Sequence, residues 1–203
     1  IKNGNDIKKH FPQVISTNLY PPAIPSLQVP FKIDTAKVVR RKPYMLSKAK
    51  VEWLDNEIDF LKKNGIIRDS SSPYASPVTL VAKGDSWRLC TDYRVLNEQT
   101  ELLSWPLPRI DDIIADTGGY KVFSTFDLLK GFWQIPLTSD TKKFTAFVTP
   151  SGTYEYNVLP FGWKNSPKYF QMIMDKILST HKEFCRYYID DILVFSRTVQ
   201  EHE

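Results

Sequence analysis

The sequence predicts an α+β fold in which antiparallel strands pack on amphipathic helices. Three pairs of apolar runs flank short turn sequences, the pattern of β-hairpins, and two longer segments carry apolar residues at helical spacing. The chain has 203 residues, 42% of them hydrophobic, which suffices for one or two domains with a buried core.

The composition excludes several classes of protein. No run approaches the ~18 apolar residues of a membrane span, and the amino terminus lacks the apolar run of a signal peptide. Cys90 and Cys185 are too few for a disulfide framework, so we expect a reducing compartment. Residues 1–50 hold ten Lys or Arg and two Asp, a basic excess that is weak evidence for nucleic-acid binding on an otherwise slightly acidic chain.

The first elements are a connector and a helix. Residues 1–43 form a basic, Pro-rich connector whose prolines from Pro21 to Pro43 lie too close together for a helix of normal length. We expect the basic segment from Ile1 to Lys50 to pack along the next part of the chain as an extended strap. From Ser47 onwards helical spacing predicts a helix that stops at Gly65; its apolar positions are Val51, Leu54, Ile58 and Leu61.

The middle of the chain alternates strands and turns. Residues 78–82 and 87–93 flank a charged tip at 83–86 and predict a hairpin. A short helix is expected around residues 110–114, before Gly118, and a buried strand over 122–126 with Asp127 at its end. Residues 144–149 and 153–158 predict a second hairpin.

The last segment combines a helix with a third hairpin. Ser166 as N-cap and Pro167 at the first helical position open a helix that we expect to pack beneath a sheet. Its apolar stripe consists of Phe170, Ile173, Met174, Ile177 and Leu178. The apolar runs 184–189 and 192–195 then flank a turn at Asp190-Asp191.

Two Asp-Asp pairs differ in their surroundings. Asp111-Asp112 opens a short helix, where the unpaired amides of the first turn favour negative charge. Asp190-Asp191 lies between two apolar strands, and with Asp127 it would form a cluster of like charges that requires a cation, for which Mg²⁺ is suited. The spacing alone leaves two interpretations open, a shared metal site or three unrelated strand-end aspartates.

The motifs around these aspartates, in their order along the chain, resemble those of reverse transcriptases, most closely the polymerase of gypsy-type LTR retrotransposons. The resemblance runs from about Pro43 to Glu203. The motifs are Gly65-Ile66-Ile67-Arg68, Ser71 to Pro77, Trp87-Arg88, Asp92 to Asn97, Pro106 to Asp112, Phe126-Asp127-Leu128, Gly131-Phe132, Leu159 to Gly162, Ser166-Pro167, Phe170-Gln171 and Tyr188 to Asp191. Departures from the usual gypsy-type pattern are Trp163, Ser166 and Phe132-Trp133.

The resemblance implies a right-hand polymerase without its thumb. Residues 103–134 and 166–203 would form the palm, and residues 44–102 and 135–165 the fingers. Asp127, Asp190 and Asp191 would be the catalytic residues and the ligands of two Mg²⁺ ions, which Mn²⁺ can replace. One ion would lower the pKa of the primer 3′-hydroxyl and the other would stabilise the pyrophosphate leaving group.

The resemblance also assigns residues to the substrates. Lys83 and Arg88 would contact the triphosphate of the dNTP, Phe132 would exclude a 2′-hydroxyl, and Phe161 and Gly162 would lie against the nucleotide. Template or primer contacts would come from Pro73, Tyr74, Arg94, Asn97 and Tyr188. Taken singly and without the resemblance, most of these residues are more typical of turns, surface charges or core packing.

The expected function is that of an RNA-directed DNA polymerase segment of a retrotransposon Pol polyprotein. Its partners would be an RNA or DNA template with primer, dNTPs and the thumb, connection and ribonuclease H domains of the full product, without a membrane. We expect a cytoplasmic location within retrotransposon particles. The alternatives are a truncated, non-catalytic descendant that binds nucleic acid or protein, and an RNA-dependent RNA polymerase, which would not need a bulky side chain at Phe132.

Overall fold

The computed structural model describes residues 7, 9–12, 22–30, 32–34 and 37–203. The chain divides into two compact units, each of which is described by itself. Unit 1 comprises Ile1–Pro21, Ser104–Gly131 and Pro167–Glu203, and unit 2 comprises Pro22–Leu103 and Phe132–Ser166. The names palm and fingers remain predictions for these units.

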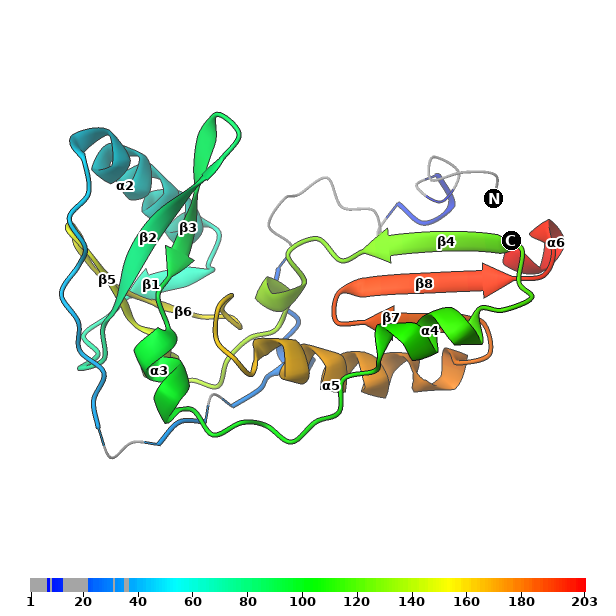
Figure 1. Cartoon of the computed structure of the whole chain (residues 1–203). Helices are drawn as coiled ribbons and strands as arrows, with labels where there is room; N and C mark the ends of the chain where they lie inside the picture. Colours follow the sequence, from blue (N-terminus) through cyan, green and yellow to red (C-terminus); the bar gives the residue numbers. More distant parts are fainter. Residues whose placement is uncertain (1–6, 8, 13–21, 31, 35–36) are drawn as a thin grey trace. The chain divides into compact units, whose positions relative to one another are not determined.

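Unit 1 is built on a three-stranded antiparallel sheet in the order β4-β8-β7 (Figure 1). Its strands are β4 (Val122–Asp127), β7 (Cys185–Tyr188) and β8 (Asp191–Ser196). Its helices are α4 (Ile110–Asp116), most of α5 (Ser166–Leu178), the 3-10 turn η4 (Ser179–His181) and α6 (Val199–His202). The sheet packed on helices confirms the predicted α+β class.

Helix α5 lies along one face of this sheet (Figure 1). Phe170, Ile173 and Met174 are 4–7% exposed, as the predicted apolar stripe requires, whereas Ile177 at the end of the helix is 49% exposed. The predicted N-cap is only partly right, because the helix begins at Ser166 itself and the Ser166 hydroxyl donates to the carbonyl of Pro160 at 2.6 Å. The buried stripe holds the helix against the strands that carry the carboxylates.

Unit 2 contains a five-stranded sheet in the order β1-β6-β5-β2-β3, in which only the β2–β5 pairing is parallel. Its strands are β1 (Ile67–Asp69), β2 (Ser76–Lys83), β3 (Ser86–Thr91), β5 (Phe147–Thr149) and β6 (Gly152–Tyr156). Its helical segments are η1 (Pro25–Leu27), α2 (Lys48–Lys63), α3 (Arg94–Gln99), most of η2 (Gly131–Gln134) and η3 (Lys142–Thr145).

The predicted helix after Ser47 is α2. Leu54, Ile58 and Leu61 are at most 2% exposed, and the helix is followed by Gly65 in the left-handed region with φ of 70°. The Gly65 amide donates to the carbonyl of Lys62 at 3.0 Å, which closes the last turn of the helix.

Two predicted boundaries in unit 2 are wrong. The second hairpin starts at Phe147 rather than residue 144, because Thr145 belongs to η3 and its hydroxyl accepts the amide of Tyr156 at 2.8 Å, in place of a strand partner. The first hairpin ends at Thr91 rather than residue 93. The Asp92 side chain accepts the Arg94 amide at 3.2 Å, and the unpredicted helix α3 begins there.

The described part of the Pro-rich connector belongs to unit 2 from Pro22 onwards. Val29 forms a parallel bridge with Leu137, and Arg40 forms one with Ala75. These contacts tie an extended segment along unit 2, as expected for a strap. The predictions for residues 1–6, 8, 13–21, 31 and 35–36 lie outside the described residues.

No helix among the described residues is long and apolar enough to cross a membrane. Cys90 is half-buried, Cys185 is buried, and both are free thiols.

Candidate carboxylate site

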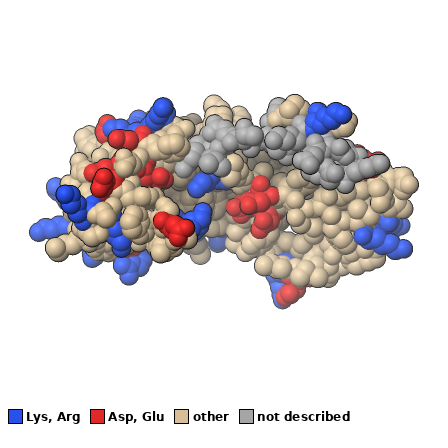
Figure 2. Space-filling view, turned by 90° about the horizontal axis from the view of Figure 1, so that it is seen from above, with Lys and Arg blue, Asp and Glu red and all other residues tan. Residues whose placement is uncertain are grey.

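The antiparallel pairing of β4 with β8 brings two of the predicted aspartates together. Asp127 is the last residue of β4, Asp191 is the first of β8, and the two are register partners. Directly paired residues project to the same face of a sheet with Cβ atoms about 5 Å apart. Asp190 lies in the turn before Asp191, and Tyr188, a predicted primer or template contact, is the β7 partner of Asp191. Figure 2 shows acidic side chains gathered on the surface near the end of β4.

The turn that carries Asp190 has an unusual backbone. Ile189 has φ of 57°, in the left-handed region, which costs a residue other than glycine about 1–2 kcal/mol. Two hydrogen bonds hold the turn in this conformation. The Ile189 amide donates to Gln171 Oε1 at 2.9 Å, and the amide of Leu128 donates to the carbonyl of Asp190 at 3.1 Å.

Gly131 lets the chain after β4 lie close to this turn. A Cβ at position 131 would be 2.8 Å from Cζ of Phe170 and 3.3 Å from Cβ of Asp190. Any larger residue must therefore displace the aromatic ring or the turn. Glycine at this position, within the predicted Gly131-Phe132 motif, is explained by space.

The electrostatics of the site favour a cation. Burial, together with the negative charges of Asp191 and Asp127, raises the pKa of Asp190. Within the described residues, none of the three carboxylates forms an ion pair. Three hard oxygen donors without a positive partner match the chemistry that Mg²⁺ prefers.

The three carboxylates are not gathered into a metal-binding geometry in this structure. In the part of the chain that the structure describes, no three His, Cys, Asp or Glu side chains are gathered closely enough to hold an ion. Asp127 and Asp191 are exposed at their strand ends, whereas Asp190 is half-buried. The donor set fits a cation, while its final geometry depends on how these side chains turn.

The predicted triphosphate contacts lie on the β2–β3 hairpin of unit 2. Lys83 ends β2 opposite Ser86, and Arg88 on β3 pairs with Val81. Both side chains are exposed, and neither forms an ion pair with another described residue. Their positive charges are therefore available to an anion.

The predicted residues beside the nucleotide form an aromatic cluster in unit 2. The rings of Phe132 and Phe161 are 4.9 Å apart, and Trp133, which was not predicted, lies 5.7 Å from Phe161. Phe132 is 9% exposed and Phe161 45%, so Phe161 presents the accessible ring. Gly162 follows with φ of 87°, a conformation that glycine adopts without strain.

Asn97, a predicted template contact, holds the loop after Gly162. Its amide nitrogen donates to the carbonyl of Gly162 at 2.9 Å, and its oxygen accepts the amide of Lys164 at 2.9 Å. Tyr74 is likewise engaged within the fold, 5% exposed and edge-on to Phe144, while Pro73 is exposed. These contacts give Asn97 and Tyr74 partners within unit 2, and their template contacts remain predictions.

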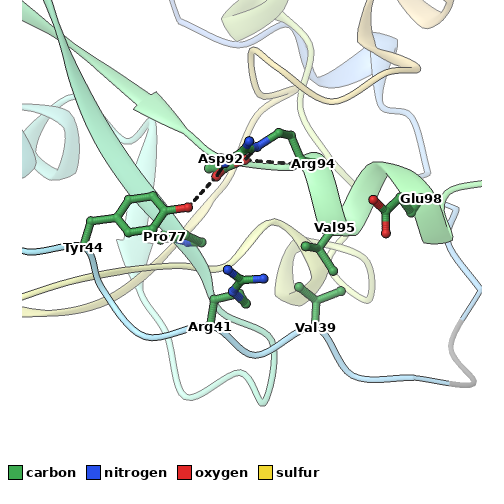
Figure 3. A pocket seen from close by; sticks show the side chains of 8 residues that line it. All are labelled: Val39, Arg41, Tyr44, Pro77, Asp92, Arg94, Val95 and Glu98. Atoms are coloured by element: carbon green, nitrogen blue, oxygen red, sulfur yellow. Dashed lines mark hydrogen bonds and ion pairs between the residues drawn. The ribbon is translucent and has the colours of Figure 1, made fainter.

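Arg94 lines a cavity of about 270 Å³ in unit 2 (Figure 3). Its guanidinium donates twice to Asp92, at 2.8 and 2.7 Å, and the Tyr44 hydroxyl donates to the same carboxylate at 2.7 Å. Arg41 also lines the cavity and forms no ion pair with a described residue. Apart from the basic character of the connector, no sequence pattern indicated Arg41 or Tyr44.

The sequence also did not predict that hydrogen bonds link Gln171, Asp175 and Trp105 in unit 1 to the turn before Asp190. Gln171 is 1% exposed between the apolar residues of the α5 stripe. A polar residue inside an apolar helix face, four positions before an aspartate, was the available signal.

Two departures from the expected family pattern have structural partners in unit 2. Trp163 is 1% exposed, and its indole nitrogen donates to the Thr100 hydroxyl at 3.0 Å. Ser166 bonds to Pro160 as described above. Neither side chain belongs to the carboxylate site.

Comparison with known proteins gives consistent matches. A family model described as reverse transcriptase (RNA-dependent DNA polymerase) matches residues 81–203. The enzymatic polyprotein of cauliflower mosaic virus (strain Strasbourg) is 36% identical over 174 residues, covering 83% of this chain and 26% of that protein. The retrovirus-related Pol polyprotein from transposon 297 of Drosophila melanogaster is 39% identical over 168 residues, covering 79% of this chain and 16% of that protein.

Solved structures agree with these relatives. The foamy viral protease-reverse transcriptase in complex with RNA/DNA hybrid has a TM-score of 0.76 and 30% identity, covering 85% of this chain and 24% of that chain. A mutant of the prototype foamy virus protease-reverse transcriptase has a TM-score of 0.82 and 27% identity, covering 98% and 27%. The chain thus spans about a quarter or less of the length of these relatives.

Proposed function

The chain belongs to the reverse transcriptase (RNA-dependent DNA polymerase) family, and from this premise we propose that it is the part of an RNA-directed DNA polymerase that carries the catalytic carboxylates. It would add dNTPs to a primer 3′-hydroxyl on an RNA or DNA template. The observation that carries the proposal is the pairing of Asp127 with Asp191 beside Asp190, three carboxylates without a positive partner among the described residues.

We propose that Asp127 and Asp190 hold two Mg²⁺ ions and that Asp191 completes the ligand set, with Mn²⁺ as a substitute. Bound metal would supply a lowered pKa at the primer hydroxyl and charge stabilisation at the leaving pyrophosphate. The chain's own contribution is to keep the three carboxylates at one edge of the sheet. The raised pKa of Asp190 supports this role, because a cation would relieve the repulsion that raises it.

Unit 2 would bind the nucleotide. Lys83 and Arg88 are exposed on one hairpin and suit the triphosphate, Arg88 by bidentate contact. Phe132 would act as the gate against a 2′-hydroxyl, with Phe161 and Gly162 alongside. The accessible ring of Phe161 supports a stacking contact in this cluster.

Template contact is assigned to Pro73 and Arg94, and Arg41 is added because it shares the cavity of Arg94. Phosphate contacts of this kind are tolerant of sequence, as a copying enzyme requires. The foamy viral relative solved with an RNA/DNA hybrid supports a nucleic-acid partner. Tyr74, Asn97 and Tyr188 remain predictions.

For the whole protein we propose a gypsy-type retrotransposon Pol polyprotein with thumb, connection and ribonuclease H domains, located in cytoplasmic particles. The 39% identity to the Drosophila transposon Pol polyprotein supports this assignment. The caulimovirus polyproteins, at 36% identity, are the competing class.

The decisive experiment measures dTTP incorporation on an oligo(dT)-primed poly(rA) template with Mg²⁺. Asp190→Asn should lower incorporation to background, because it removes a metal-ligand charge while keeping the size of the side chain. Asp112→Asn is the matched control, since Asp112 is an exposed aspartate in the same unit, and it should retain full activity.

Nucleic-acid binding by the same variants separates the alternatives. The polymerase assignment requires Asp190→Asn to keep affinity for the primed template while losing incorporation. If the wild-type chain binds the template but neither it nor Asp190→Asn incorporates dTTP, the binding-module alternative is favoured. If both incorporate dTTP equally, the carboxylate site is not catalytic.

A further inference from the structure

A partly buried series of hydrogen bonds leads from Trp105 to the turn before Asp190. Gln171 Oε1 accepts the Ile189 amide at 2.9 Å, and Gln171 Nε2 donates to Asp175 Oδ1 at 3.1 Å. The Trp105 indole nitrogen donates to the other oxygen, Asp175 Oδ2, at 2.7 Å. All four residues belong to unit 1.

Gln171 is the residue of this series with the least freedom. It is 1% exposed, and an amide side chain so deeply buried is tolerated only when both of its polar ends are bonded. One end is bonded to the backbone of the turn, and the other to a carboxylate that is itself fixed by an indole. The orientation of the amide is therefore set by Asp175, which leaves the Gln171 oxygen facing Ile189.

The hydrogen bond from the Ile189 amide to Gln171 supports the backbone directly before Asp190. Ile189 directly precedes Asp190, and its φ of 57° is one that a β-branched residue does not adopt without support. The second support of the turn, the Leu128 amide on the Asp190 carbonyl, comes from the chain after β4. The turn is thus held from both sides, by α5 and by the β4 end.

We propose that Gln171 is a positioning residue that sets the backbone before Asp190, and that Asp175 and Trp105 act through it. Its role in catalysis rests on the proposed function of Asp190, but the positioning itself does not. The arrangement favours one placement of the Asp190 carboxylate before any metal or nucleotide binds.

Amide hydrogen exchange of the 203-residue chain, followed by NMR, tests the positioning. Gln171→Met keeps side-chain length but removes both hydrogen bonds, and should raise Ile189 amide exchange about tenfold. The Phe195 amide, bonded to the Phe184 carbonyl in the same sheet, should be unchanged. Gln200→Met, at an exposed position in unit 1, is the control. Equal Ile189 exchange in the two variants would overturn the proposal.

Trp105→Phe tests the far end of the series with a conservative change. It removes only the indole donor, so Ile189 exchange should rise by a smaller factor, about threefold. This variant also keeps the proposal open to refutation if Gln171→Met does not fold. Unchanged Ile189 exchange in Trp105→Phe would overturn the relay through Asp175.

A charge-conserving exchange supplies a rescue. Gln171→Glu alone places two carboxylates against each other and should accelerate Ile189 exchange. Adding Asp175→Asn restores every bond, because the new amide can donate to position 171 and accept from the Trp105 indole. The double variant should return Ile189 exchange to within about twofold of wild type. A double variant as fast as Gln171→Glu would contradict the hydrogen-bond mechanism.

Mg²⁺ titration of the same samples separates this proposal from the proposed function. Gln171→Met should need several-fold more Mg²⁺ than Gln200→Met to shift the amide signals of Asp127, Asp190 and Asp191. In Asp190→Asn these shifts should be lost while Ile189 stays protected. If Mg²⁺ shifts no signal in wild type, the metal assignment fails, and the exchange experiment still decides the positioning.

Discussion

The β2–β3 and β7–β8 hairpins contain the same backbone dihedral and stabilise it in different ways. Gly84 in the first hairpin and Ile189 in the second both have φ of 57°. A Cβ at Gly84 would meet nothing within 4 Å, so glycine is favoured there only by the left-handed backbone, which it adopts without strain. The conformation of Ile189 depends on two hydrogen bonds, from its own amide to Gln171 and from the Leu128 amide to the Asp190 carbonyl. One turn is specified by its own residues, the other by tertiary contacts.

The carboxylates next to these hairpins differ in the same way. Asp92, which follows β3, accepts two hydrogen bonds from the Arg94 guanidinium and one from the Tyr44 hydroxyl. These bonds hold the pKa of Asp92 well below its usual range. Burial and two like charges raise the pKa of Asp190. Asp92 is neutralised within the fold, whereas Asp190 has no positive partner among the described residues. That contrast separates a structural carboxylate from a functional one.

The largest effect is expected from Gly131→Ala, which disturbs the supported turn directly. The added Cβ would be 2.8 Å from the Phe170 ring and 3.3 Å from Asp190 Cβ, so the ring or the turn must move. A displacement of about 1 Å at reacting groups can cost about 100-fold in rate. We expect kcat for dTTP incorporation, measured per folded molecule, to fall about 100-fold.

Gly65→Ala is the control for this variant. Gly65 has φ of 70° with no atom near an added Cβ, so the substitution strains the end of α2 without touching the carboxylates. It should lower the free energy of unfolding and leave kcat unchanged. Equal losses of kcat in the two variants would show that general destabilisation, and not the Asp190 turn, is responsible.

A smaller effect is expected when the unsupported turn is given the residue of the supported one. Gly84→Ile places a β-branched side chain at φ of 57° without a bond equivalent to that from Gln171. The free energy of unfolding, measured in urea, should fall by about 1–2 kcal/mol. Asp85→Ile, at the neighbouring turn position, is the control and should cost clearly less. Equal costs would mean that the left-handed backbone is not the source of the loss.

The sequence was sufficient for the elements whose periodicity is local. Helix α2, helix α5 and the hairpins follow from apolar spacing and turn residues, and the fold class follows from these. The errors lie where side chains replace backbone partners. The Thr145 hydroxyl accepts the Tyr156 amide, and the Asp92 carboxylate accepts the Arg94 amide where α3 begins. A hydrophobic pattern contains neither hydrogen bond.

The site was predictable to the same extent. Strand ends and a resemblance in motif order indicated Asp127, Asp190 and Asp191, because their chemistry is carried by residue type and position. The support of the turn was not, since Gln171 meets Ile189 only after α5 has packed on the sheet. Asn97, a predicted template contact, also bonds to Gly162 and Lys164, and the sequence pattern did not indicate these two partners.

The smallest expected effect concerns the neutralised carboxylate, and it depends on pH. The pKa of Asp92 is lower in the folded chain than the ordinary value of about 4, so its bonds stabilise the fold above that value. This contribution is lost as the pH falls through the folded pKa. Asp92→Asn keeps the shape and one acceptor oxygen, but it removes the charge and replaces the second acceptor with an NH2 donor. It should lower the urea midpoint modestly at pH 7.

The difference from wild type should shrink below about pH 4, where Asp92 of the unfolded wild-type chain becomes protonated, and vanish only below the lowered pKa of the folded chain. Urea titrations between pH 7 and about pH 2.5 measure the decrease. Asp85→Asn, at the exposed tip of the same hairpin, should match wild type throughout. If the urea midpoint of Asp92→Asn stays below that of wild type by a constant amount down to the lowest pH, the shape of the side chain, and not its charge, stabilises this end of β3. The contrast between Asp92 and Asp190 would then lose its electrostatic basis.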